Sequence, residues 1–572
     1  METQESEPGE PANAAQGSTA AEQIPGESIV DEAETTPRAS LETTSVAAKS
    51  MGVADDATDA HDNDDAGDQD SASIDLFMAR DPISLYGEVS LPRAGILGVP
   101  GVTHETAALS AGLLTTNHAE FHCFFNDKGF HNHLAHAILT VYSLGATSEQ
   151  IKATYERCKA VQRPMLPLKD VVITEENWRD FLGREAYYSR YLQFFITQCR
   201  ELGGPACIER YVLEDDQGQM LIRWFSGAWH PFILTGFGIE FALDAVTAEG
   251  LAACCVHSPQ AAPLLKAMST RASKSPFLTF ASSFATGLRP LAARASPSVV
   301  SFVATAQRLP RIHRVPKEGL SGLTIIDHMS EDPRLRAGQA NSYESKNKFD
   351  DCLHNRAKAL NAWCAEWIID SDGGWEEIVM RAEELIWIAT LLESAVSRPG
   401  QPTRCDFFLM HGLNSMLFLP SMLEVLSPSS RITVLECSFR MLVAYWVARG
   451  RPQLHIVDVL MRASNTPKPP SEAIADQSAG TVWPSLIAAA ATHPDEHLSK
   501  AIRSLAFAAS LFGHSPPGIY KCSLPGSDIL DGSCFVRAAG LHLNAIGWCL
   551  NDEEPADWDR SGLGFDEAWQ AS

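Results

Sequence analysis

The stretch WEEIVMRAEELIWIATLL, residues 375–392, decides the fold class, because its apolar residues recur three and four positions apart. This spacing puts them on one face of an α-helix, and residues Arg431–Ala448 repeat it. Alternation typical of strands is scarce, except at Ile208–Trp224, where two apolar runs flank DDQG (215–218) in the manner of a β-hairpin. The sequence therefore predicts an all-α fold, a large multi-helical single domain with a small β element.

The N-terminal segment differs in composition from the rest of the chain. Residues 1–70 hold 18 acidic residues against Arg38 and Lys49, and they contain no Phe, Tyr or Trp. Such a segment cannot bury enough apolar surface to offset its conformational entropy. We therefore expect a disordered acidic tail over residues 1–73 and a helical domain over residues 74–572.

Charge and composition exclude several classes of protein. The net charge of −26 excludes a basic nucleic-acid-binding protein. The start, METQE, lacks the basic and apolar segments of a secretory signal, so we expect a cytoplasmic protein with reduced cysteines. The apolar run Phe407–Leu423 contains His411 and Pro420 and is shorter than a membrane span of about 20 residues. It predicts a buried helix, not a membrane segment.

The segment HAEFHCFFNDKGFHNHLAH, residues 118–136, carries five histidines in nineteen residues. A helical run from about residue 103 to 125, a turn at 126–129 and a second helix from about 130 to 145 predict a helix–loop–helix hairpin. His118 and His122 would then share one helix face, and His133 and His136 another. If the two faces meet, up to four imidazoles converge.

Converging imidazoles suit iron, copper, zinc or nickel, and facing helices are a common scaffold for such sites. They suit acid–base chemistry equally well, because an imidazole titrates near neutral pH. Each histidine taken alone is more often a core or capping residue. His230, in WHPFILTGFG, and His411, in DFFLMH, also lie in apolar surroundings where a buried imidazole needs a partner.

Other motifs carry less information. HPDEH, residues 493–497, matches the inverted zincin pattern, but Pro494 belongs in a first helical turn, so His493 precedes the helix and the match is a coincidence. Tyr445, Arg449 and Arg451 could line an anionic pocket, although cations at a helix C-terminus explain them as well. The chain has no Gly-rich dinucleotide motif for NADPH or flavin, no P-loop and no G-x-S-x-G.

Several long blocks resemble the questin oxidase-like family of fungal secondary metabolism. In order between about residues 90 and 550 they read NHAEFHCFFNDKGFHNHLAHAILTVYSLGA, WHPFILTGFGIEF, EELIWIATLLES, DFFLMHGLNSMLFLPSMLEVLSP and AYWVARGRP. The resemblance implies an oxidoreductase that opens a ring of a polyketide anthraquinone or related aromatic ketone. The implied reaction is a Baeyer–Villiger-type monooxygenation that uses molecular oxygen and NADPH. Some relatives resemble non-haem iron oxygenases, which implies histidine-held iron.

One position departs from the family pattern. After His-Pro the family commonly shows a second histidine, and this chain has Leu234, which cannot ligate a metal. A histidine doublet of the family is likewise reduced to His122-Cys123. Either these positions are not catalytic, or this member has a changed metal site, a changed substrate or no activity.

The family's histidines match His118, His122, His131, His133, His136, His230 and His411. We predict His122, His133, His230 and His411 as metal ligands, and His118, His131 and His136 as catalytic acid or base groups. Four aromatic side chains could pack against a flat substrate: Phe124, Phe125, Trp229 and Phe237. Two alternatives stay open, namely a metal-free acid–base enzyme and a non-catalytic binding or scaffold protein of the same fold.

Overall fold

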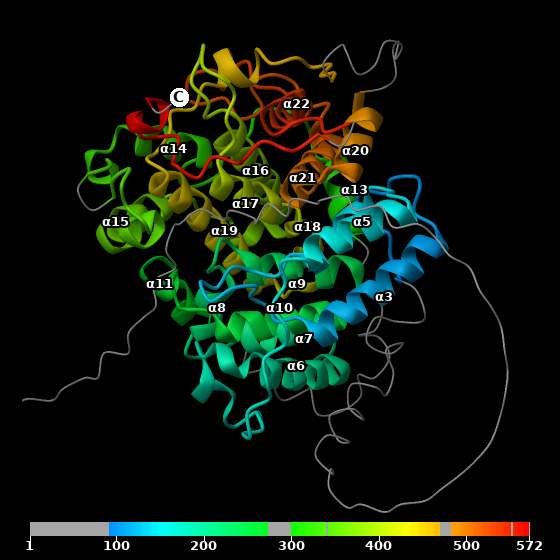
Figure 1. The fold of residues 1–572 in the computed structure, drawn as a ribbon. Coiled ribbons are helices and arrows are strands. Elements are labelled where there is room, and N and C mark those ends of the chain that lie inside the picture. The colour runs from blue at the N-terminus through cyan, green and yellow to red at the C-terminus, as the bar shows by residue number, and fades with distance from the viewer. Residues whose placement is uncertain (1–90, 273–298, 339–340, 470–481, 551–552, 571–572) are drawn as a thin grey trace, which may run out of the picture.

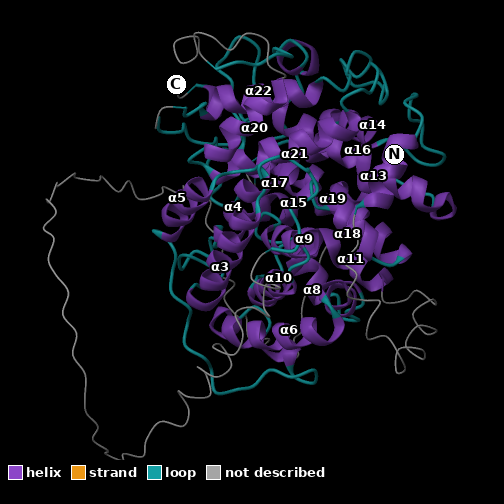
Figure 2. Ribbon diagram, turned by 90° about the vertical axis from the view of Figure 1, so that its right-hand side faces the viewer, coloured by secondary structure: helices purple, strands orange, loops and turns teal. Residues whose placement is uncertain are grey.

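The structure, a computed structural model, describes residues 91–272, 299–338, 341–469, 482–550 and 553–570. The predicted acidic tail over residues 1–73 lies outside these ranges. Within them the chain is helical, and its β-type pairings are four isolated bridges. Figure 2 shows helices and loops throughout the described part. The all-α prediction is confirmed.

The helices of the N-terminal half are α3 (His104–Glu120), α4 (Leu134–Ser143), α5 (Ser148–Lys159), α6 (Tyr188–Leu202), α7 (Gly204–Ile208), α8 (Gln219–Trp224), α9 (His230–Phe241), α10 (Asp244–Val256) and α11 (Ala262–Ala272). Those of the C-terminal half are α13 (Val300–Arg308), α14 (Gly322–Glu331), α15 (Lys348–Cys364), α16 (Gly374–Ser394), α17 (Phe407–Met416), α18 (Leu419–Val425), α19 (Pro428–Ala448), α20 (Val482–Thr492), α21 (Glu496–Phe512) and α22 (Cys534–Ile546). Short 3-10 and π segments are η1 (Trp178–Phe181), η2 (Glu185–Tyr187), η3 (Glu209–Leu213), η5 (Pro333–Leu335), η6 (Ser371–Gly373), η7 (Ile456–Leu460) and η8 (Asp566–Trp569).

The helices are stacked in layers, with the buried helix α16 in the interior. In Figures 1 and 2, α6 lies at the bottom with α10 and α9 above it, and α21 and α22 lie near the top. Helix α16 is buried continuously from Arg381 to Ser394 and packs on α17, α19 and α22. A helix that is apolar on all sides lies in the interior of a large domain. α16 therefore lies in the core. Its spacing predicts one buried face, but the helix is buried on all sides over this range.

Four helices form a closed ring in the middle of the stack. α4 contacts α9, α9 contacts α17, α17 contacts α21, and α21 contacts α4. These helices come from both halves of the chain. Residues at or near their N-terminal ends supply the site described below.

The predicted β-hairpin at Ile208–Trp224 is wrong. The segment forms the end of α7, the π segment η3 and helix α8. Asp215 explains the difference: its carboxylate accepts the N–H groups of Gln219 and Met220 at 2.7 and 3.2 Å, at the start of α8. The DDQG sequence therefore begins a helix, a role that Asp and Gly fill as readily as a hairpin turn.

Two predicted helix boundaries also differ. α3 ends at Glu120 and not at residue 125, because Phe121 is extended and pairs with Pro164 in a bridge. The second helix of the hairpin begins at Leu134 and not at residue 130. His118 is thus on a helix and His122 is not, so the predicted shared face of these two residues is wrong.

The run Phe407–Leu423 is buried, as predicted, but it forms two helices. α17 ends at Met416, and α18 begins at Leu419 with Pro420 in its first turn. Proline lacks the N–H that a continuous helix would need at this point. In the described part of the chain, every helix is too short or too polar to cross a membrane.

Candidate functional site

Four buried histidines from the ring of helices form one group, which we call the histidine cluster: His133, His230, His411 and His497. His133 is the N-cap of α4, His230 begins α9, His411 lies in α17, and His497 is in the first turn of α21. The Nε2 atoms of His133 and His230 are 2.9 Å apart. Ring centroids are 4.9 Å apart for His230 and His411, 4.9 Å for His133 and His497, and 5.3 Å for His411 and His497.

Hydrogen bonds fix the tautomer of two of these rings. Nδ1 of His230 donates to the Gly227 carbonyl at 2.6 Å, and Nδ1 of His411 donates to the Phe407 carbonyl at 2.7 Å. Each Nε2 is left with a lone pair, the arrangement usual for metal-binding histidine. Nε2 of His411 and of His497 has no hydrogen-bond partner among the described residues. Ligating atoms of His133, His230 and His411 lie within 4.8 Å of one another, so these residues could hold a metal ion.

The loop before His230 has an unusual backbone. Gly227, Ala228 and Trp229 all have positive φ values, of 55°, 49° and 63°. For Ala and Trp this left-handed conformation is strained, and such strain is common at functional sites. The Ala228 N–H donates to Oη of Tyr445 at 3.1 Å, which holds the loop in place.

Further histidines surround the cluster. His131 stacks on His230 with the ring centroids 3.9 Å apart and the planes within 3°, and its Nε2 lies 2.5 Å from Nε2 of His257. His136 lies 5.5 Å from His133 between ring centroids, and neither of its nitrogens has a partner in the described part of the chain. Nδ1 of His118 is 2.7 Å from Oε1 of Glu249 in a buried pair.

Among the predicted ligands, His122 lies apart from the cluster. Its Nδ1 accepts the Phe124 N–H and lies 3.0 Å from Nη2 of Arg163, and its ring packs on Tyr188. The early end of α3 at Glu120 accounts for this placement.

Sequence reasoning missed His497 and His257. The HPDEH motif did point to His497, which lies in the first turn of α21. The other histidine of the motif, His493, lies before the helix as expected, and its Nε2 is 3.1 Å from the Gly547 carbonyl oxygen. His257 follows α10 in a segment with no recognisable motif.

The surroundings keep the imidazoles neutral. Burial holds the pKa values of His131, His133, His136, His230 and His497 well below the ordinary value. Lys500 adds to the effect at His133, His136 and His497, and neighbouring imidazoles add to it at His131 and His230. Burial and then Lys500 lower the pKa of His411 to about 3. The N-termini of α4, α9 and α21 all lie at the cluster, and their partial positive charge disfavours protonation of the imidazoles. Neutral imidazoles can bind a metal or accept a proton.

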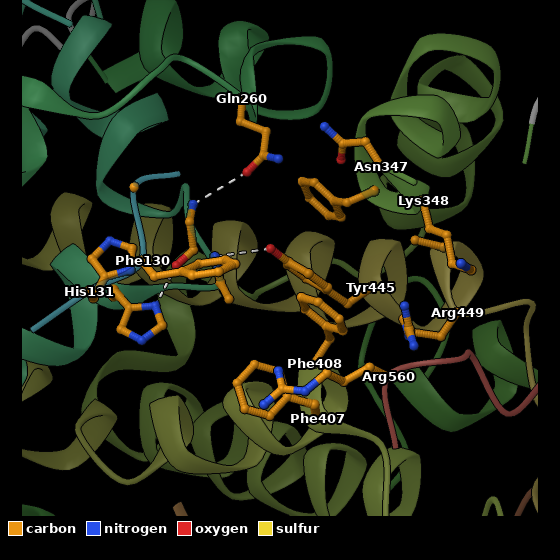
Figure 3. A pocket seen from close by; sticks show the side chains of 16 residues that line it. Phe130, His131, Gln260, Asn347, Lys348, Phe407, Phe408, Tyr445, Arg449 and Arg560 are labelled. Carbon is orange, nitrogen blue, oxygen red and sulfur yellow. Dashed lines mark hydrogen bonds between the residues drawn. The ribbon is translucent and has the colours of Figure 1, made fainter. Parts of the chain in front are cut away.

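A pocket opens beside the cluster, with a volume of about 800 Å³ counted to its mouth. His131 and His230 line it, so the pocket and the cluster share a wall. In Figure 3, His131 lies on one side of the aromatic side chains, and Lys348 and Arg449 lie on the other. The remaining lining side chains used in the argument are Phe130, Phe349, Phe407, Phe408, Tyr445 and Arg560.

Phe349 and Phe408 are nearly parallel to Tyr445 in this pocket, whereas Phe407 stands at 89° to Phe408. Phe349 and Tyr445 stack at 4.1 Å between centroids and 18° between planes, and Phe408 and Tyr445 differ by 12°. The guanidinium of Arg449 lies over Phe408 and pairs with Asp406 at 2.9 Å. An aromatic wall with cations at one end suits a flat, electron-rich ligand.

The residues that line this pocket differ in part from those that the sequence predicts. None of the four aromatic residues proposed to pack on a substrate lines this pocket in the described structure, and Trp229 lies behind Tyr445, stacked on it at 4.6 Å. Of the three residues proposed for an anionic pocket, Tyr445 and Arg449 line it. Arg451 instead donates to the carbonyls of Met329 and Asp332.

A second cavity adjoins the cluster on another side. Its wall includes His118, His136, Leu234 and Glu249. Leu234, where the resemblance described above led us to expect a histidine, therefore lines a space next to two of the predicted catalytic residues.

Comparison with known proteins gives one consistent result. The family model described as questin oxidase-like matches residues 130–505, well over half of the chain. The chain is 28% identical to the Baeyer-Villiger oxidase ptaJ of Pestalotiopsis fici, over 69% of this chain and 78% of that protein. It is 26% identical to a questin oxidase of Aspergillus terreus, over 80% and 91%, and 26% identical to the oxidoreductase AflY of Aspergillus parasiticus, over 71% and 74%. The chain belongs to the questin oxidase-like family of oxidoreductases.

Proposed function

We propose that this protein catalyses the oxygen-dependent ring opening of a polyketide anthraquinone or related aromatic ketone by Baeyer–Villiger-type oxygen insertion. The shared wall of the pocket and the histidine cluster carries the proposal. A flat substrate in the pocket would lie against His131 and His230, and His230 contacts His133 at 2.9 Å. The names of the relatives, Baeyer-Villiger oxidase and questin oxidase, agree with this reaction.

The balanced reaction sets what the protein must supply. Ketone, O₂, NADPH and a proton give an ester, water and NADP⁺. One oxygen atom enters between the carbonyl carbon and a neighbouring ring carbon, and the other leaves as water. The sequence has no Gly-rich dinucleotide motif, so we infer that NADPH acts as a reductant without a Rossmann site of its own.

The lining residues would bind the substrate, stabilise negative charge on it and transfer a proton. Phe407, Phe408 and Tyr445 form an apolar aromatic wall against which the ring system can pack. The cations Lys348, Arg449 and Arg560 attract the carbonyl and phenol oxygens and stabilise negative charge that develops on them. His131 is neutral and can accept a proton, and His257, 2.5 Å from it, can share that proton.

A metal ion fits the cluster on two observations. His230 and His411 hold their Nε2 lone pairs inward by bonding Nδ1 to carbonyls, and Nε2 of His411 has no hydrogen-bond partner in the described residues. We assign His133, His230 and His411 as the ligands, with His497 as a fourth in place of His122. Iron held there would supply the redox chemistry that lets O₂ react with an organic molecule. His118, His131 and His136 stay in our proposal as acid–base groups around that centre.

The test uses purified protein, a hydroxyanthraquinone, NADPH and ¹⁸O₂, with products followed by mass spectrometry. We expect a product that has gained one ¹⁸O atom. The variant His411→Gln should lose the activity, while His328→Gln, an exposed histidine of α14, should keep it.

Each other outcome has a defined meaning. Full turnover after chelation would favour the metal-free acid–base enzyme over the metal assignment. Unchanged substrates across a broad panel of aromatic ketones would overturn the proposed function and favour the binding or scaffold protein, to which Leu234 lends support.

A further inference from the structure

A second group of ligand-type side chains lies outside the histidine cluster. It consists of Glu393 in α16, Cys405 just before α17, and His542 in α22. One ligating atom of each lies within 4.8 Å of the others, and all three residues are at most 3% exposed. The three elements are far apart in sequence, so the grouping is a product of the tertiary fold.

Glu393 is the unusual member. Within the described residues, the polar groups beside its carboxylate are the Cys405 thiol, which can donate to it, and Nε2 of His542, 3.3 Å from Oε1; neither contact has the geometry of a good hydrogen bond. A buried carboxylate whose neighbours are a thiol and a neutral imidazole has no positive charge to balance its own, and burial raises the pKa of Glu393 well above its ordinary value. At this depth it must be neutralised by a proton or by a cation.

His542 is oriented as a ligand. Its Nδ1 donates to the Ala538 carbonyl at 2.8 Å, so the Nε2 lone pair faces Glu393. A backbone carbonyl that fixes Nδ1 in this way is the usual support of a metal-binding imidazole. In the described part of the chain, Nε2 has no hydrogen-bond partner of its own.

We propose that Glu393, Cys405 and His542 form a second metal site, which takes a divalent cation with affinity for thiolate, Zn²⁺ above all. One thiolate, one imidazole and one carboxylate are all ligand types of zinc, and three protein ligands leave a fourth position for water. Cys405 also lines a cavity of about 700 Å³ together with Trp558 and Asp559, which offers a route for the ion and a water molecule.

The position of this site gives it a structural role. Cys405 immediately precedes Asp406, which caps α17 and pairs with Arg449 of the substrate pocket. The Cys405 carbonyl also accepts the Asp559 N–H at 2.8 Å. An ion at Cys405 would therefore hold together α16, α22 and the start of α17, the helix that carries His411.

Cobalt distinguishes this site from the histidine cluster, because only this site offers a thiolate. Full-length protein is stripped with a chelator and reloaded with Co²⁺, and the near-ultraviolet thiolate-to-cobalt charge-transfer band is recorded. We expect the band in the native chain and in His411→Gln, and its loss in Cys405→Ser. The matched control Cys437→Ser, a buried cysteine of α19, should keep the band. Zinc content should fall by one equivalent per chain in Cys405→Ser and in Glu393→Gln.

The proposal can be overturned without any variant. Zinc-edge X-ray absorption of the native, zinc-loaded protein reports whether sulfur is among the ligands, and a shell of nitrogen and oxygen alone would refute the site. A cobalt band that persists in Cys405→Ser would refute it as well. Unchanged zinc content in Glu393→Gln would also refute the site as proposed, because a proton shared with His542 would then be what neutralises this carboxylate.

Discussion

Replacing Gly227 by alanine should lower the free energy of unfolding and disturb the site. The loss of unfolding free energy has two parts. The first part is backbone strain, because φ is +55° at this position, and the left-handed conformation costs an L-residue about 1–2 kcal/mol. The second part is steric, because an added Cβ would collide with the His257 ring and come within 2.9 Å of Cε1 of His131. Overpacking of this kind costs about 1–3 kcal/mol, so the total loss of unfolding free energy should be about 2–5 kcal/mol.

Gly400→Ala is the matched control for the steric part. Gly400 has φ of +78°, and nothing lies within 4 Å of an added Cβ, so only the backbone strain applies. Urea unfolding of both variants, followed by circular dichroism, should place Gly227→Ala about 1–3 kcal/mol below Gly400→Ala. Product formation should fall in the first variant only, because His131 must move. Equal destabilisation of the two variants would refute the argument that His131 and His257 close tightly over this glycine.

Three further predictions concern charge, ligands and substrate. The folded pKa of His411 is about 3 and the unfolded value is about 6.5, so stability is complete above pH 6.5 and is lost as the pH falls. Urea unfolding at pH 6 and pH 5 should show a loss of up to about 1.4 kcal/mol for each such histidine, and equal stability would contradict neutral burial. His497→Gln should lower bound iron, measured by elemental analysis, and His493→Gln should not; the reverse result would remove His497 from the ligand set. Phe408→Leu keeps the wall apolar but removes the ring face, so the Kd for a hydroxyanthraquinone should rise about two- to tenfold in a fluorescence titration, from the loss of about 0.5–1.5 kcal/mol; an unchanged Kd would contradict stacking on this ring.

The helical architecture was accessible from sequence because it rests on local spacing. Residues 375–392 form part of α16, and Arg431–Ala448 form part of α19, as the apolar pattern predicts. The hairpin at Ile208–Trp224 failed because Asp215 and Gly218 serve helix starts and strand turns alike. The end of α3 at Glu120 depends on pairing with Pro164, a contact that no local pattern reveals.

The site was accessible only in part, for the same reason. His133, His230 and His411 belong to blocks that are long enough to be recognised, and the fold places them together. His497 was dismissed because Pro494 separates it from His493, but its place beside His411 is set by the packing of α21 on α17. The pocket wall combines α15, the start of α17, α19 and Arg560, and no single stretch of sequence carries that combination.

The contribution of residues 553–570 has a consequence for biosynthesis. Asp559 pairs with the backbone of Cys405 and Phe407, and Arg560 next to it lies over the Phe407 ring. While this segment is still inside the ribosome, the pocket lacks Arg560, one of its cationic lining residues. Turnover is thus expected only after these residues have emerged and Arg560 has reached the pocket, so a fusion that holds them away from α17 should lower turnover.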